Sequence, residues 1–196
     1  MARAAKVGEA LLRADAAAVE AMTPHRETLP VRALEHVADL GNQPQLRILC
    51  GSAILVGLAG GDRRLTRTGL RMLAAHTLAT WAKDFVKHRV DRTRPRSRGD
   101  RAGDHRIAPG RSKAKEETSF PSGHSAGAAA VAAAYAREYP DRAAPALAAG
   151  GALALAQIPR CAHYPTDVGA GLAIGFAAEA GVDALFRFGQ ARLSSR

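Results

Sequence analysis

The sequence predicts an all-α protein, a bundle of about five to six antiparallel helices embedded in a membrane and preceded by an amphipathic helix. Hydrophobic residues make up 47% of the 196 residues and aromatic residues only 5%, so the core has to be built from small side chains, mostly Ala, which favour helices. Alternating runs of β-branched and aromatic residues, typical of strands, are almost absent. Long apolar stretches supply the helices.

The N-terminal region is expected to form an amphipathic helix followed by a shorter one. Over residues 5–22, the helical period places apolar side chains on one face: Val7, Leu11, Ala14, Ala18 and Met22. Residues 23–45 are polar and interrupted by proline, with a short helix expected around residues 31–40.

Five apolar stretches follow, with few or no charged residues. They are residues 48–61, 69–85, 118–136, 143–159 and 168–178. Gly and Ala dominate them, as at closely packed helix interfaces. Only one or two reach the roughly 18–20 residues of a spanning helix, so a bundle buried within a soluble protein stays an alternative to a membrane bundle.

These features divide the chain into three parts. We expect an N-terminal amphipathic helical region over residues 1–44, the helical bundle over residues 45–187, and a basic C-terminal tail over residues 188–196.

The positive charge is concentrated in one segment. The chain carries +10, and residues 87–115 contain eleven Lys or Arg against three Asp, a net +8. Such a block indicates an anionic partner, either phosphate or nucleic acid. Aromatic side chains that would stack on bases are not interleaved with the charges, which argues against nucleic acid. A basic nucleic-acid-binding helical protein without catalysis stays an alternative.

One polar cluster opens this basic segment and a second follows it, each at the end of an expected helix. In the first, Lys87 and Arg94 supply cationic donors, and the guanidinium can hold two oxygens of a phosphate at once. In the second, Ser122 is expected to cap a helix whose first amides, at Gly123 and His124, would bind an anion.

A third cluster opens the last apolar stretch. His163 and Asp167 are four residues apart, so on a helix the carboxylate can hold the imidazole in one tautomer. A nucleophile and the group that orients it have this relation.

The three clusters in this order, Lys-x6-Arg-Pro, Pro-Ser-Gly-His and His-x3-Asp, resemble the type 2 phosphatidic acid phosphatase and vanadium haloperoxidase superfamily over residues 45–185. The resemblance implies that His163 attacks phosphorus to form a phosphohistidine, with Asp167 orienting it, and that His124 is the general acid and base. It further implies no metal or other cofactor, and a phosphate-binding set of four residues: Lys87, Arg94, Ser122 and Gly123.

The third motif departs from the family pattern, which normally begins Ser-Arg. Gln157 stands at the position of that Arg and Ala156 at that of the Ser. An amide can donate a hydrogen bond but brings no charge, so we expect weaker or altered phosphate binding. Arg160, three residues later, is a second candidate for this contact. A degenerate, non-catalytic member of the family stays an alternative.

The predicted function is hydrolysis of a lipid phosphate, as a metal-independent phosphomonoesterase or diphosphatase, with a phosphorylated lipid or isoprenoid as substrate. A soluble, broad-specificity acid phosphatase of the same superfamily is the alternative. If each apolar stretch crosses the membrane once, all three motifs lie on one face, and the other face carries arginine clusters. The positive-inside rule then predicts a multi-pass protein of the cell membrane with its active site on the non-cytoplasmic face. The sequence makes no prediction of oligomeric state.

Overall fold

The computed structural model describes residues 2–97 and 107–194, and nearly all regular structure within them is helical. The helices are α1 (Ala2–Met22), α2 (Leu29–Ala38), α3 (Gln43–Ala59), α4 (Arg63–Lys87), α5 (Gly123–Glu138), α6 (Ala143–Leu155) and α7 (Pro165–Ser194). The all-α prediction is confirmed for this part of the chain.

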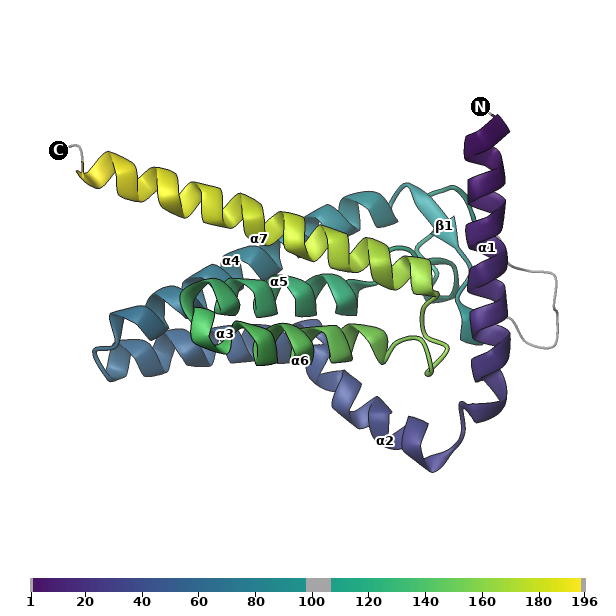
Figure 1. Cartoon of the computed structure of the whole chain (residues 1–196), viewed down its shortest axis with the longest axis horizontal. Coiled ribbons are helices and arrows are strands. Elements are labelled where there is room, and N and C mark those ends of the chain that lie inside the picture. The colour runs from purple at the N-terminus through teal and green to yellow at the C-terminus, as the bar shows by residue number, and fades with distance from the viewer. Residues whose placement is uncertain (1, 98–106, 195–196) are drawn as a thin grey trace.

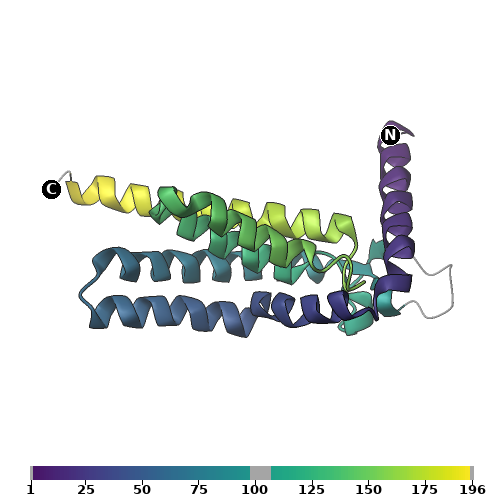
Figure 2. The same cartoon turned by 60° about the horizontal axis from the view of Figure 1, so that its bottom comes forward.

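Helix α5 is the centre of the bundle. It packs against α4, α6 and α7, and α3 packs along α4 (Figures 1 and 2). Ten of the 16 residues of α5 are buried, because its Ala and Gly residues let the neighbouring helices approach closely. On α7, a side chain added at Gly171 or Gly175 would run into the backbone of α5.

The expected apolar stretches correspond to the helices α3 to α7. The last helix is much longer than the stretch that predicted it, and residues 188–194 continue it where a separate tail was expected. Within the described residues, α7 is the one helix both long and apolar enough to cross a membrane, over Pro165–Arg192.

A buried ion cluster joins α4, α5 and α7. Arg71 donates to Glu138 at 3.0 Å and also pairs with Asp183. Arg137 pairs with Glu179 at 3.0 Å. Because each buried carboxylate has a cationic partner, the cluster avoids the cost of an isolated buried charge.

Helix α1 lies across the other end of the bundle, where α4 ends and α5 and α7 begin (Figures 1 and 2). From residue 6 onward, where its side chains are described, α1 buries Asp15 and Val19. On the face predicted to be apolar, Val7 and Leu11 are 54% and 51% exposed, so this part of the face does not pack on the bundle, whereas Met22 packs against Val19, Cys161 and Tyr164.

A short antiparallel pair of strands follows α4, β1 (Val90–Arg92) and β2 (Ile107–Pro109). Each has three residues, too few to show an alternating pattern in the sequence.

Candidate active site

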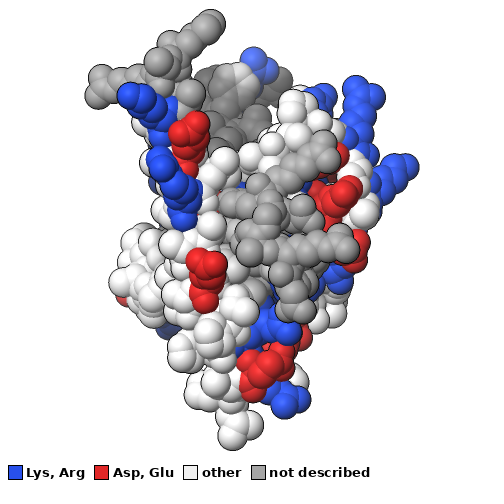
Figure 3. Space-filling view, turned by 90° about the vertical axis from the view of Figure 1, so that its right-hand side faces the viewer, with Lys and Arg blue, Asp and Glu red and all other residues white. Residues whose placement is uncertain are grey.

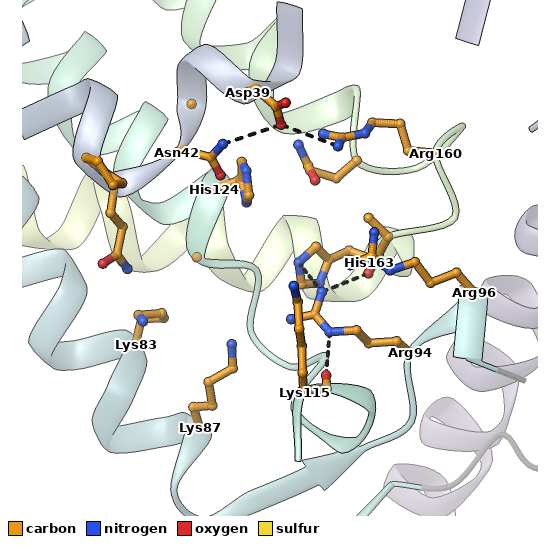
Figure 4. A pocket seen from close by; sticks show the side chains of 16 residues that line it. Asp39, Asn42, Lys83, Lys87, Arg94, Arg96, Lys115, His124, Arg160 and His163 are labelled. Atoms are coloured by element: carbon orange, nitrogen blue, oxygen red, sulfur yellow. Dashed lines mark hydrogen bonds and ion pairs between the residues drawn. The ribbon is translucent and has the colours of Figure 1, made fainter. Parts of the chain in front are cut away.

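A cavity of about 540 Å³ opens at the end of the bundle that α1 crosses (Figure 4). Figure 3 looks onto this end, where basic and acidic side chains both gather. The cavity brings together segments far apart in the sequence. Of the residues singled out from the sequence, it is lined by Lys87, Arg94, Gly123, His124, Gln157, Arg160 and His163.

Asp167 lies behind the cavity, next to His163. Its carboxylate Oδ2 is 3.5 Å from Nδ1 of His163, and it accepts hydrogen bonds from the Ser119 hydroxyl and, at 3.0 Å, from the Tyr164 amide. The other oxygen, Oδ1, pairs with Arg92. Nδ1 of His163 is buried and makes no hydrogen bond within the described residues, so Asp167 is its nearest acidic neighbour rather than a bonded partner.

Burial favours the neutral form of the His163 imidazole. It lowers the pKa of His163 below the ordinary value of 6.5, although the neighbouring Asp167 carboxylate opposes the change. A neutral imidazole has the lone pair that a nucleophile needs.

Arg94 lies next to Nε2 of His163. Its Nη1 is 3.3 Å from that nitrogen and also donates to the Ala162 carbonyl, while its Nε donates to the Lys115 carbonyl and its Nη2 to the Thr118 carbonyl. Burial is the main cause that lowers the pKa of Arg94 below its ordinary value, and an arginine stays charged regardless. The site therefore holds a cation within hydrogen-bond reach of Nε2 of His163.

Lys87 is the last residue of α4 and adds a second cation. Burial, followed by the nearby charges of Arg94 and Lys83, lowers its pKa to about 8. Lys83 lies one helical turn earlier and also lines the cavity. Crowded positive charges with few counter-charges favour an anionic ligand.

The start of α5 forms the opposite wall. The prediction that Ser122 caps this helix is confirmed: its hydroxyl accepts from the Ser125 amide at 3.4 Å. Ser122 is fully buried and is not among the residues that line the cavity, so its contact with phosphate stays a prediction. Gly123 lies against Lys83, where a Cβ would be 3.3 Å from the lysine side chain.

His124 follows on the first turn of α5 and faces the same cavity as His163 (Figure 4). Its Nε2 is buried and has no hydrogen-bond partner among the described residues. A buried nitrogen without a partner is costly, so it is suited to a group that a substrate brings.

Gln157 and Arg160 lie in the turns that follow α6 rather than on a continued helix. The Gln157 side chain donates only a long bond, 3.5 Å, to the Leu153 carbonyl. Arg160 is held through Nη2, which donates to Glu35 at 2.9 Å and lies 3.5 Å from Asp39. Its Nε and Nη1 are buried and have no partner among the described residues.

Sequence reasoning missed several residues of the site. Lys83, Arg96 and Lys115 line the cavity, and the spacing of Lys83 to Lys87, one helical turn, is a signal that could have found the first. Asp15 and Arg92 lie behind Asp167. No local pattern points to Asp15. Residues 98–106 of the basic segment lie outside the described residues.

The described part of the chain has no group of three or more His, Cys, Asp or Glu side chains placed to hold a metal ion. The functional groups that it brings together are cations and imidazoles, which bind anions.

Comparison with known proteins agrees with this arrangement. The fold is similar to that of the first transmembrane PAP2 type phosphatidylglycerolphosphate phosphatase from Bacillus subtilis, with a TM-score of 0.63 and 20% identity over 91% of this chain and 87% of that one. It is also similar to Aquifex aeolicus LpxE, with a TM-score of 0.56 and 19% identity over 84% of this chain and 91% of that one. No curated protein matches the sequence.

A family model described as the PAP2 superfamily matches residues 68–188, well over half of the chain and including all three motifs. The chain therefore belongs to the PAP2 superfamily.

Proposed function

We propose that this protein is a metal-independent lipid phosphate phosphatase that works through a phosphohistidine on His163. The observation that carries the proposal is the convergence of His163, His124, Lys87 and Arg94 on one cavity. Membership of the PAP2 superfamily and the fold shared with two solved proteins, one of them named a phosphatidylglycerolphosphate phosphatase, support it.

The mechanism follows from the arrangement of the side chains. Nε2 of His163 attacks phosphorus as the ester P–O bond breaks, and His124 protonates the leaving oxygen. Lys87 and Arg94 stabilise the negative charge on the phosphoryl oxygens in the transition state. His124 then takes a proton from water, which attacks phosphorus, and the P–N bond breaks to release phosphate.

Arg160 supplies the charge that the family arginine would have brought at position 157. Its side chain is nine-tenths buried and lines the cavity, and its Nε and Nη1 have no partner among the described residues. Glu35 and Asp39 hold its remaining nitrogen, so the guanidinium is positioned before a substrate arrives.

The substrate is a phosphorylated lipid or isoprenoid, and the protein lies in the cell membrane with its cavity on the non-cytoplasmic side. Large apolar side chains on the outer faces of the helices are exposed, as expected of surfaces that contact lipid. They include Ile48, Leu55, Leu58, Trp81, Phe85 and Phe188. This outer surface favours a membrane phosphatase over a soluble one.

The test is a phosphate-release assay of the purified full chain in detergent micelles. Substrates are phosphatidic acid, a prenyl phosphate, a prenyl diphosphate and a soluble aryl phosphate, each with and without EDTA. We expect release from at least one lipid, unaffected by EDTA, and none from His163→Ala. Brief reaction with ³²P-labelled substrate should leave acid-labile, alkali-stable label on the wild-type protein. Label that persists on folded His163→Ala contradicts the proposed nucleophile.

A further inference from the structure

A chain of buried charged groups connects α1 to the carboxylate behind His163. It begins at Asp15, in the middle of α1, continues through Arg92 on β1, and ends at Asp167. The side chains of all three are at most 1% exposed. None of the three lines the cavity. Asp15 belongs to none of the three sequence motifs, and Arg92 stands at one of the six unspecified positions of the first.

Arg92 bridges the two acids with separate nitrogens. Its Nη2 donates to Oδ2 of Asp15 at 2.6 Å, while Nη1 donates to Oδ1 of Asp167 and, at 2.7 Å, to the Thr166 hydroxyl. Its guanidinium also stacks on the Tyr164 ring, 4.2 Å from the ring centre. Because Arg92 holds Oδ1, the other oxygen of Asp167, Oδ2, lies on the side of Ser119, the Tyr164 amide and His163, 3.5 Å from Nδ1 of that histidine.

Asp15 also holds the backbone beside the nucleophile. Its Oδ1 accepts from the Thr166 amide at 3.0 Å, and its Oδ2 accepts from the Thr166 hydroxyl. Apolar contacts add to this attachment, because Val19 of α1 packs against Cys161 and Tyr164. The segment from residue 161 to 167 is therefore clamped from the side of α1.

The charges along this chain alternate in sign. Without Asp15, the full charge of Arg92 would face Asp167 in a water-excluded interior and compete with His163 for its carboxylate. With Asp15 present, Arg92 is shared between two carboxylates.

We infer that Asp15 is a positioning residue for catalysis, which acts through Arg92 and Thr166 to hold Asp167 against His163, so that α1 is a working part of the active site. This inference rests on the proposed function, because it assigns the support of the proposed nucleophile. Residues 2–22 lie outside the segment that matches the family model, so the support comes from a part of the chain that the family match does not include.

The test compares Asp15→Asn with Asp183→Asn in the full chain. Both replace a buried, arginine-paired carboxylate by its isostere, but Asp183 belongs to the ion cluster at the far end of the bundle. We expect Asp15→Asn to lower kcat by about ten- to hundredfold with KM within about twofold, as when an outer partner that orients a reactive histidine is lost. Asp183→Asn should lower the unfolding temperature but leave kcat nearly unchanged.

A double-mutant cycle identifies the route. If Asp15 acts through Arg92, then Asp15→Asn should cost much less in an Arg92→Gln background than in the wild type. Should Asp15→Asn fail to fold, Arg92→Lys gives the same readout, because lysine keeps the charge but cannot bridge two carboxylates as a guanidinium does.

Hydrogen exchange measured by mass spectrometry supplies a readout that needs no activity. The peptide that contains residues 163–167 should exchange faster in Asp15→Asn, because the NH2 group that replaces Oδ2 cannot accept from Arg92 and from the Thr166 hydroxyl and so loosens this segment. The same peptide should be unchanged in Asp183→Asn. A wild-type protein that hydrolyses no phosphate ester would overturn the proposed function while this comparison still decides the role of α1. Equal exchange, or a kcat of Asp15→Asn within twofold of the wild type, would overturn the inference.

Discussion

At the scale of single residues, Asp167 and His163 divide one task between them. In the proposed mechanism Asp167, whose Oδ2 lies 3.5 Å from Nδ1, orients the ring, and His163 attacks through Nε2. Asp167→Asn keeps the shape but turns a nitrogen donor or a weaker acceptor toward the ring, so kcat should fall by about 10²–10⁴-fold, as for other oriented histidines. His163→Ala should abolish turnover. Steady-state kinetics of both variants, with circular dichroism as the control for folding, check this. Near-normal turnover in His163→Ala would exclude the mechanism.

The alkaline limb of activity should belong to Lys87. Its charged form binds the phosphate, and with a pKa of about 8 that charge is lost as the pH rises through 8. The profile of kcat/KM, which reports the free enzyme, should therefore fall above about pH 8. In Lys87→Arg the limb should move to higher pH, because a guanidinium stays charged. A limb that stays near pH 8 in this variant would assign the titration to another group.

A third test asks whether Arg160 makes the phosphate contact that the family arginine would make from position 157. If Arg160 contacts the phosphate, Arg160→Ala removes a charge-assisted hydrogen bond typically worth about 1.5–3 kcal/mol, and kcat/KM should fall by about tenfold or more. Inhibition by vanadate should weaken in parallel. Gln157→Arg should then give little gain, because two guanidinium groups would compete for one anion. A large gain from Gln157→Arg with no loss from Arg160→Ala would instead indicate a site weakened at position 157.

At the scale of elements, glycines on α7 decide how closely it approaches α5. A Cβ at Gly175 would collide with the backbone of α5, whereas one at Gly169 would meet nothing within 4 Å. Gly175→Ala should destabilise the protein by about 1–3 kcal/mol through overpacking. Gly169→Ala, on the same helix, should stabilise it by about 0.5–1 kcal/mol through the gain in helix propensity. Thermal unfolding in one detergent compares the two, and equal shifts would contradict the close packing of these helices.

At the scale of the whole molecule, the exposed apolar faces of the helices lead us to expect contact with membrane lipid. Trp81 is the single tryptophan of the chain, and it is 70% exposed on the outer face of α4. If this face contacts lipid, lipids brominated on their acyl chains should quench its fluorescence in vesicles, and aqueous iodide should not. Strong iodide quenching without bromolipid quenching would place α4 outside the membrane. The wild-type protein needs no substitution for this measurement.

The sequence by itself predicted the helices α3 to α7, because long Ala-rich and Gly-rich stretches between polar clusters carry a local signal. The same holds for Lys87, Arg94, His124 and His163, whose motifs sit at the ends of those helices and so meet in one cavity. The Ser122 cap was equally local, since a helix start is decided by the few residues around it.

Only the tertiary structure decided what lies behind the site. Asp15 is separated from Thr166 by 151 positions along the chain, and its role depends on how α1 crosses the bundle. The exposed face of α1 carries the stronger apolar pattern, with Val7 and Leu11, while the buried face holds a charged residue. A hydrophobic pattern predicts burial only where apolar contacts provide the stabilisation. In α1, the ion pair of Asp15 with Arg92 and its hydrogen bonds with Thr166 provide the stabilisation instead. These partners lie far away in the sequence, so they are known only once the chain has folded.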